Sequence, residues 1–448
     1  MGAALAVAFA LSGPVAVAAP PPAVDTAIPV PRGDKPDRAY KQSVRCIENS
    51  AQQVDLKGAP WGQDRLQFDD LGKFATGKGV TVAVIDTGVR PHPWLPNLKG
   101  GGDFVAPHNG LEDCDGHGTL VAGIIAARTP EDTGFRGIAP DATILSIRQS
   151  SANYEFEDAD RSKKPAGTLK TLAQAIVRAV DQGADVINMS INQCRTAGPI
   201  TPDEKVLQRA LHYAVVEHDV VVVASAGNTQ EDGCPDATNG PDPNNPTHIV
   251  TPPWFTDYVL SVGAMNRTGD PATFTMQGPW VSVSAPGTEI TSLNPAGDGL
   301  ANKRKSTDGK PADIQGTSFA APYVAGLAAL IKERFRDEKL TARQIMERIK
   351  LTASHPAAPG GHDNLVGHGM VNPVGALTAM IPAEQGVPPE ESVDVRMQMP
   401  PAVPKDWTPM QVALIGAGGG LLLLLLTLFV VHTVRRNQPG GAEDRGRS

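Results

Sequence analysis

The sequence lacks several patterns that would assign it to a common class of protein. It has 40 Lys and Arg against 48 Asp and Glu, and no basic stripe stands out, which argues against nucleic-acid binding. Neither C-x-x-C nor H-E-x-x-H occurs, so no zinc site is indicated. No internal repeat is visible, and G-x-S-x-G, the motif of α/β-hydrolase esterases, is absent. The sequence therefore implies no nucleic acid, no metal and no cofactor.

Both ends of the chain carry apolar runs. Residues 5–19 end in small residues, and Ala16 and Ala18 fit the A-x-A pattern of a secretory signal peptide, although the usual basic start is missing. Residues 412–431 are 20 residues without a formal charge, enough to span roughly 30 Å of hydrocarbon. Arg435 and Arg436 follow directly. Because positive flanks stay inside, we expect a single-pass plasma-membrane protein with a cytoplasmic C-terminus and an extracytoplasmic body.

Between these ends, β-branched runs alternate with helical patterns. Residues 79–89 are predicted to form a buried strand and residues 116–127 a helix, and the same alternation continues along the chain. Such alternation indicates parallel strands joined by helical crossovers, which is an α/β fold with a doubly wound parallel sheet. Residues 149–167 and 229–253 interrupt the pattern, and their polar or Pro- and Gly-rich composition predicts long irregular surface loops.

One late helix has a proline close to its start. In the segment "IQGTSFAAPYVAG", Pro322 follows Ser318 by four residues and removes the helical hydrogen bond to the Ser318 carbonyl. That loss is small in the first turn, so Ser318 is predicted at a helix N-terminus with its own N–H unbonded. Such a position suits a nucleophile whose oxyanion needs a backbone donor, although an ordinary N-cap serine would look the same.

Three further polar residues lie at strand or helix ends. Asp86 ends the first buried strand, His117 starts the next helix, and Asn228 ends "VVVVASAGN". In a doubly wound sheet these positions gather at the carboxyl edge, where sites form. A serine needs a base, histidine titrates in the right range, a carboxylate orients it, and an amide can bind an oxyanion. Each residue alone could be an ordinary turn or loop residue.

Together, the four positions match a known family. The blocks "VIDTGV", "DGHGTLVAGIIA", "ASAGN" and "GTSFAAPYVAGLAAL" resemble the signatures of the subtilisin-like serine proteases, in the order Asp, His, Asn, Ser. The resemblance covers about residues 60–380. It implies that Asp86 orients His117, that His117 acts as the base for Ser318, and that Asn228 stabilises the oxyanion. The substrate cleft it implies is lined by Ser190, Ile191, Asn192, Ala226 and Gly227.

Some positions depart from the common subtilase pattern. Phe319 stands where methionine is usual, and Gln193 and Cys194 replace the glycines usual on the strand that lines the cleft. A simple broad specificity is therefore not implied, and no calcium site is assigned. The extension before the protease blocks shows no strand–helix pattern and is too short for a folded inhibitor, so we expect it to wrap around the domain.

The order of segments resembles the mycosins, membrane-anchored subtilases of actinobacterial type VII secretion systems. That resemblance implies exported proteins as substrates and the membrane complex of the secretion system as a partner. A second interpretation is a structural component of the complex, for which cleavage is secondary. The expected segments are a signal peptide (1–18), an extension (19–59), the protease domain (60–381), a Pro-rich linker (382–409), a transmembrane helix (410–432) and a cytoplasmic tail (433–448).

Four cysteines fit an exported protein with two disulfides, and they allow three pairings. Cys194 and Cys234 each follow the end of a predicted strand, and consecutive parallel strands often neighbour each other, which predicts a Cys194–Cys234 bond. Cys46 in the extension is then the partner of Cys114, close to the start of the helix that carries the histidine. That bond would hold the extension beside the active site.

Overall fold

The computed structural model describes most of the chain, and the bulk of the described residues belongs to one compact unit that ends at Pro388. The predicted signal peptide lies outside the described residues, as do most of the predicted linker and cytoplasmic tail. The described residues are 20–47, 53–54, 56–159, 161–231, 233–236, 238–240, 242, 245–305, 310–386 and 407–436.

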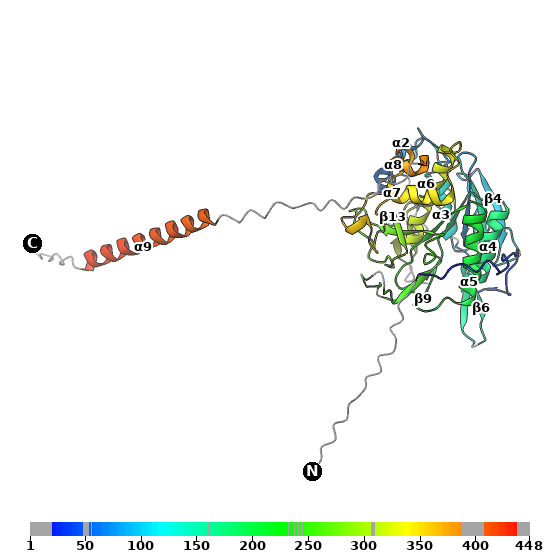
Figure 1. The fold of residues 1–448 in the computed structure, drawn as a ribbon, viewed down its shortest axis with the longest axis horizontal. Helices are drawn as coiled ribbons and strands as arrows, with labels where there is room; N and C mark the ends of the chain where they lie inside the picture. Colours follow the sequence, from blue (N-terminus) through cyan, green and yellow to red (C-terminus); the bar gives the residue numbers. More distant parts are fainter. Residues whose placement is uncertain are drawn as a thin grey trace, which may run out of the picture. The chain divides into compact units, whose positions relative to one another are not determined.

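A parallel sheet of seven strands forms the centre of this unit (Figure 1). Every neighbouring pair in it runs parallel, which confirms the expected doubly wound α/β fold. The inner strands are buried along their whole length because helices cover the sheet. In spatial order the strands are β13 (Val281–Pro286), β12 (Leu260–Met265), β10 (Val221–Ser225), β8 (Val186–Met189), β3 (Thr81–Asp86), β5 (Thr143–Arg148) and β4 (Leu98–Asp103).

Strand β3 marks the point where the winding of the sheet reverses. From β3 the chain goes to β4 and β5 on one side, and from β8 onward it continues on the other side. Open α/β sheets bind their ligands at such a switch point, beyond the carboxyl ends of the strands. Asp86 ends β3, Ser190 follows β8, and Asn228 lies three residues beyond β10.

Two pairs of helices cover the sheet. Helices α3 (His117–Ala126) and α6 (Thr317–Arg334) pack against each other and on the central strands, and nearly all of their residues are buried. Helices α4 (Leu169–Asp181) and α5 (Pro202–His212) form the second pair and are amphipathic. Each of these two begins with a threonine capping box that satisfies its first N–H groups.

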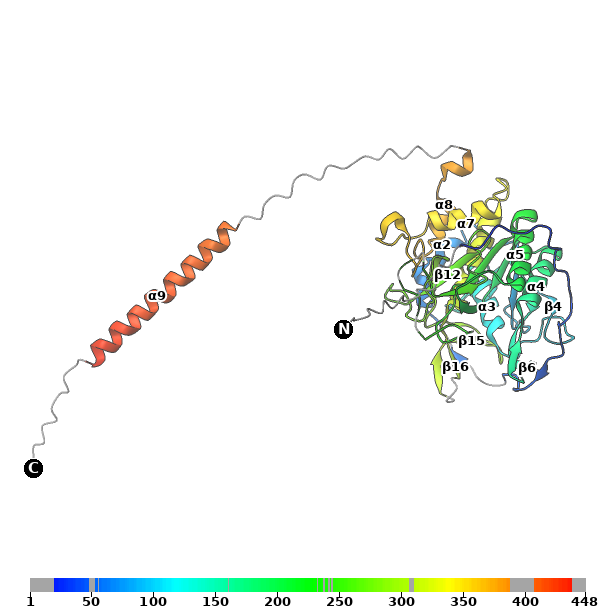
Figure 2. The ribbon, with the colours of Figure 1, turned by 60° about the horizontal axis from the view of Figure 1, so that its bottom comes forward.

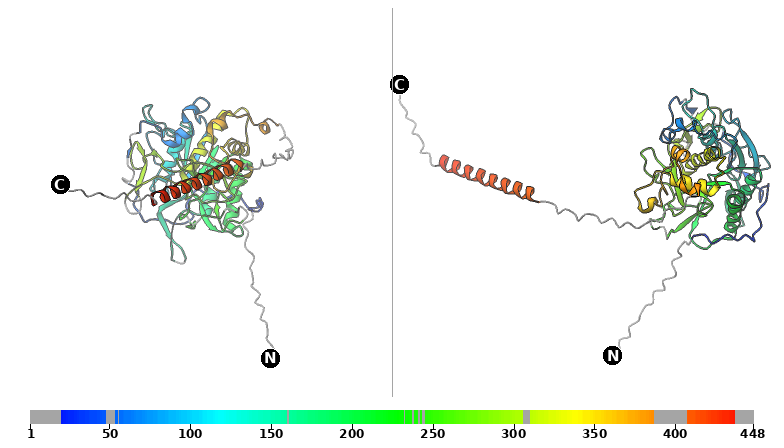
Figure 3. Two further views of the ribbon diagram at one scale, coloured as in Figure 1. Left: turned by 90° about the vertical axis from the view of Figure 1, so that its left-hand side faces the viewer. Right: turned by 45° about the horizontal axis from the view of Figure 1, so that its top comes forward.

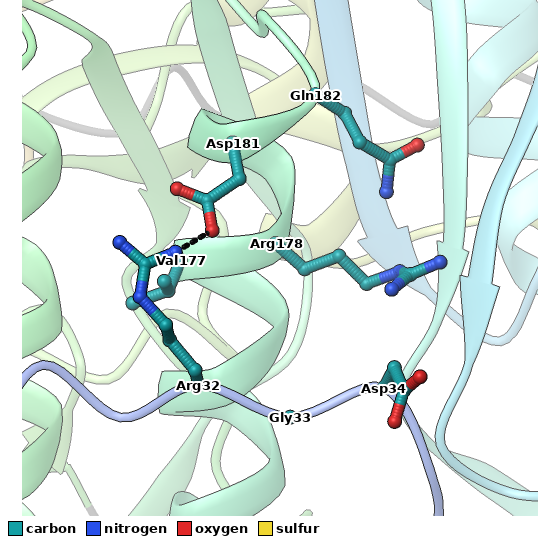
Figure 4. Close-up of a pocket in the computed structure, with 7 residues that line it drawn as sticks. All are labelled: Arg32, Gly33, Asp34, Val177, Arg178, Asp181 and Gln182. Carbon is teal, nitrogen blue, oxygen red and sulfur yellow. Dashed lines mark hydrogen bonds and ion pairs between the residues drawn. The ribbon is translucent and has the colours of Figure 1, made fainter.

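The N-terminal extension runs along the outside of this domain, as expected. Strand β1 (Lys41–Gln42) pairs with β6 (Ser151–Glu157), and the short strand β2 (Gln53–Val54) pairs with β15 (Leu300–Ala301). Figure 2 shows the dark blue extension beside α4 and α5. In Figure 4, Arg32 reaches an ion pair on α4 with Asp181.

Two segments predicted to be irregular loops contain strands, so that prediction was wrong. In the first, β6 and β7 (Lys163–Ala166) form an antiparallel hairpin. In the second, β11 (His248–Thr251) pairs with β9 (Gln193–Thr196). The polar composition hid β6 and β7, and β11 pairs with a strand that lies about fifty residues earlier in the chain. Aromatic contacts support the hairpin, in which Phe156 packs edge-on against Tyr40 of the extension.

The second unit contains helix α9 (Thr408–Arg436), which covers the predicted transmembrane stretch (Figure 3). By its length and composition this helix is long and apolar enough to cross a membrane. Arg435 and Arg436 form its last turn, where positive charge also suits the negative end of the helix dipole.

Candidate active site

Asp86 and His117 meet at the carboxyl edge of the sheet. The Asp86 side chain is fully buried, and its Oδ1 lies 2.7 Å from His117 Nδ1. Asp86 Oδ1 also accepts a hydrogen bond from the Thr87 N–H, at 2.7 Å. Gly116 caps α3 in the left-handed conformation, with φ of 79°, and so turns the chain into the helix that begins at His117. The histidine side chain keeps 25% of its surface exposed, so its ring is oriented by a buried carboxylate and still reaches solvent.

The surroundings of His117 favour its protonated form. Burial lowers the pKa of this histidine, but the charge of Asp86 and the hydrogen bond to it raise the pKa further, so the net shift is upward. The charge of Arg304 opposes this rise. Asp86 therefore stabilises the imidazolium that would form when His117 accepts a proton.

A second buried carboxylate, Asp113, holds the loop that leads into α3. It accepts hydrogen bonds from the Thr119 N–H and hydroxyl, from the Thr87 hydroxyl and from the Gly116 N–H. Burial raises its pKa to about 6, although these hydrogen bonds oppose the rise. Sequence reasoning missed Asp113, because it lies three residues before the N-cap Gly116 and not at a capping position. Asp113 therefore positions the start of the helix that carries His117.

Ser318 lies in the first turn of α6, as predicted, and is almost entirely buried. Pro322 cannot donate to the Ser318 carbonyl, and the Ser190 hydroxyl donates to that carbonyl instead, at 2.7 Å. Among the described residues, the Ser318 N–H has no acceptor. The proline thus leaves the Ser318 carbonyl free to accept from the residue that follows β8, and this bond anchors the tip of the helix.

Asn228 is held against the same helix tip. Its Oδ1 accepts from the Thr317 N–H at 3.0 Å and from the Thr317 hydroxyl at 2.9 Å. A methyl group on Gly316 would lie 3.0 Å from Ser318 Oγ and 3.4 Å from Asn228 Nδ2. Glycine at this position therefore keeps open the space into which the serine hydroxyl and the amide both point. The amide also donates to Glu231 Oε2, at 2.7 Å.

The proposed nucleophile and base are near each other without being hydrogen bonded. The ring of Phe319, the residue after Ser318, has its centroid 5.0 Å from that of His117. Within the described part of the chain, no hydrogen bond joins the Ser318 hydroxyl to His117. In unliganded enzymes such bonds are often long and tighten only when substrate binds.

The residues expected to line the cleft lie beyond β8 and β10. The Asn192 amide donates to Ser225 Oγ at 2.9 Å, and the Ala226 N–H donates to the Val262 carbonyl at 2.9 Å. Ser190 is engaged with Ser318, the Gly227 carbonyl accepts from Met276, and Ile191 is half-buried. Their contact with substrate stays a prediction.

Two disulfide bonds flank this site. The structure joins Cys46 to Cys114 and Cys194 to Cys234, the same pairing as the sequence suggested. Glu112 lies close enough to Cys46 and Cys114 to complete a group of metal-ligating types, but both sulfur atoms are bonded to each other. The first bond ties the extension to the loop before His117, and the second ties β9 to the loop after Asn228.

The comparison with family models defines the class of protein. The model of the subtilase family matches residues 77–369, a span that contains all four predicted site residues. The chain therefore belongs to the subtilases and is a serine endopeptidase.

Individual relatives show which group of subtilases the chain belongs to. Mycosin-4 of Mycobacterium tuberculosis is 41% identical over 444 residues, which is 98% of this chain and 96% of that protein. Mycosin-1 of the same species is 44% identical over 419 residues, or 89% and 90% of the two chains. Within the subtilases, the chain belongs to the mycosins.

Similar solved structures support the same assignment. The MycP3 protease from the type VII (ESX-3) secretion system has a TM-score of 0.73 at 40% identity, covering 80% of this chain and 100% of that one. A chain in the structure of an intact ESX-5 inner membrane complex has a TM-score of 0.76 at 38% identity, covering 92% and 99%.

Proposed function

We propose that Asp86, His117 and Ser318 form the catalytic triad of this endopeptidase. His117 takes the proton of the Ser318 hydroxyl as that oxygen attacks the peptide carbonyl, and later donates it to the leaving amine. Asp86 orients the imidazole and stabilises its charged form. The observation that carries this proposal is the 2.7 Å contact between the buried Asp86 carboxylate and His117 Nδ1.

The oxyanion is proposed to bind between the Asn228 amide and the Ser318 N–H. Two hydrogen bonds from Thr317 fix the Asn228 side chain, so its amide group is oriented before substrate arrives. The Ser318 N–H adds a backbone donor at the positive end of α6. Preorganised donors of this kind stabilise the charge that develops in the transition state.

In the cell, we propose that the protein processes exported proteins and supports a type VII secretion complex in the membrane. Similarity to a chain of the ESX-5 inner membrane complex supports this role. The proposed organisation is the one expected from sequence: residues 60–381 as an extracytoplasmic protease domain, residues 410–432 as the membrane span, and a cytoplasmic C-terminus. Protease added to intact spheroplasts should then remove the catalytic domain and leave the tail protected.

Two measurements test the proteolytic role. A fluorophosphonate probe should label the full-length protein at Ser318, and Ser318→Ala should abolish the labelling. Culture fluid from cells carrying Ser318→Ala should retain uncut precursors that the wild-type strain processes. Labelling that persists in Ser318→Ala would refute the assignment of the nucleophile.

A structural role in the complex is the second candidate. It is favoured by Glu231, whose carboxylate already occupies one donor of the Asn228 amide. Full secretion by a strain carrying Ser318→Ala would show that the complex needs the fold of the protein and not its chemistry.

A further inference from the structure

A small cavity opens directly beside the proposed base. It has a volume of about 60 Å³. Its lining includes His117 of α3, Phe319 of α6, Ile47 of the extension, Lys303 and Arg304. One water molecule needs roughly 10–15 Å³ of such space, so the cavity holds a few waters or the end of one short side chain. Its position next to His117 places any bound group close to the bond that is cut.

The two basic residues come from an antiparallel hairpin formed by β16 (Lys303–Lys305) and β17 (Pro311–Asp313). The chain reaches this hairpin directly from β15, which pairs with β14 (Ser292–Leu293). The Ser292 hydroxyl donates to the Leu120 carbonyl of α3 at 2.6 Å. The basic strand therefore continues from a small sheet that is fastened to the helix carrying His117.

The charges around the cavity leave one cation unpaired. The Asp115 carboxylate is engaged by the Ser151 hydroxyl at 2.6 Å and the Ala152 N–H at 2.7 Å. Lys303 forms an ion pair across the hairpin with Asp313. Among the described residues, Arg304 has no ion-pair or hydrogen-bond partner, and its side chain is exposed. The guanidinium is close enough to His117 to act on it electrostatically.

We propose that Arg304 and this cavity form a subsite for an acidic side chain, Asp or Glu, at a substrate residue next to the scissile bond. This inference rests on the proposed proteolytic function. A guanidinium can hold a carboxylate with two parallel hydrogen bonds, which sets orientation as well as affinity. The apolar walls supplied by Ile47 and Phe319 suit the methylene part of the same side chain.

The subsite also fits the charge of the whole molecule. The chain carries a net charge of −8, so its overall charge repels an acidic substrate. Arg304, a local positive charge beside His117, would then determine which bond of an acidic segment is cut. Charge at this point affects specificity more than the overall strength of binding.

The test uses the full-length protein in detergent with a library of peptides derived from a bacterial proteome. Mass spectrometry of the products should show Asp and Glu enriched at one position flanking the cut. For synthetic peptides that differ only in Glu or Gln there, kcat/KM should favour Glu by about fivefold to tenfold. Arg304→Glu should reverse this preference toward Lys and Arg at the same position. Arg343→Glu carries the same change of charge beyond the far end of α6 and should leave the preference intact.

Several outcomes would overturn the subsite. One is cleavage of the library without enrichment of Asp or Glu at a position flanking the cut. Another is an enrichment that stays the same when a normally folded Arg304→Glu variant is used. If no library peptide is cut, Glu- and Gln-containing peptides are compared for their ability to protect Ser318 from a fluorophosphonate. Equal protection would refute the subsite, whereas failure of the probe to label Ser318 at all would refute the proposed function itself.

Discussion

Glu231 places a negative charge at the donor that the oxyanion is proposed to need. Its Oε2 accepts from Asn228 Nδ2 at 2.7 Å. The turn that carries it is closed by a hydrogen bond from the Cys234 N–H to the Glu231 carbonyl at 2.8 Å, and Cys234 is bonded to Cys194. Glu231→Gln keeps an acceptor of the same length and removes only the charge. We expect this variant to cleave peptides faster than the wild type.

The size of the effect follows from the geometry. An oxyanion bound to the other hydrogen of the amide would lie about 5 Å from the Glu231 carboxylate, given a hydrogen bond of about 2.9 Å on that side. Two negative charges at about 5 Å repel each other by about 3 kcal/mol at an effective dielectric constant of about 20. The Glu231 side chain is exposed, so solvent screens the repulsion to about 1 kcal/mol. That free energy corresponds to about a fivefold rise in kcat.

The assay is steady-state cleavage of a peptide substrate by the full-length protein. Because the charge acts on the transition state and not on the bound peptide, kcat should rise while KM stays nearly constant. Glu338→Gln, an equal change at an exposed position after α6, serves as the control and should have no effect. A kcat that falls in Glu231→Gln would refute this reasoning, since it would mean that the carboxylate is needed to position Asn228.

Three further predictions concern the amide, the base and a histidine cluster. Asn228→Ala should cost about 2.7–4 kcal/mol of transition-state stabilisation with little change in KM, and a loss below about threefold in kcat would contradict its role. In Ser318→Ala, NMR should show the pKa of His117 above 6.5, and adding Asp86→Asn should lower it because the carboxylate is the source of the rise. Burial and the neighbouring charges of His362, Lys350 and His355 lower the pKa of His368, so the unfolded chain binds a proton more readily there. The free energy of unfolding should therefore fall as pH drops below about 6.5, and urea titrations should show a weaker fall in His368→Gln.

The positions of the proposed catalytic residues in the fold could be predicted because they follow strong local patterns. The strand before Asp86 and the strand before Asn228 are continuous apolar runs, and the helices after Gly116 and Gly316 are apolar all round. Such runs fix which elements are buried, and the alternation of elements fixes where their ends meet. The residues at those ends were therefore found without any knowledge of the pairing order of the sheet.

The surroundings of these residues could not be predicted in the same way. The bond from Asn228 to Glu231 lies in a turn that a disulfide ties to Cys194, 40 residues before Cys234 in the chain. The hairpin β6–β7 is stabilised in part by Tyr40, which is separated from it by more than a hundred residues. Contacts of this kind arise from tertiary packing, which overrides the composition of a polar segment.

Pro322 shows how much of a contact the local sequence can predict. The sequence alone establishes that this proline leaves the Ser318 carbonyl without its helical donor. An unpaired buried carbonyl is costly, so some donor must replace the missing one. The replacement is the hydroxyl of Ser190, which lies 128 positions away at the end of β8. Only the order of strands brings that hydroxyl to the tip of α6. The proline therefore predicts that the Ser318 carbonyl needs another hydrogen-bond donor. Which residue supplies that donor depends on the fold.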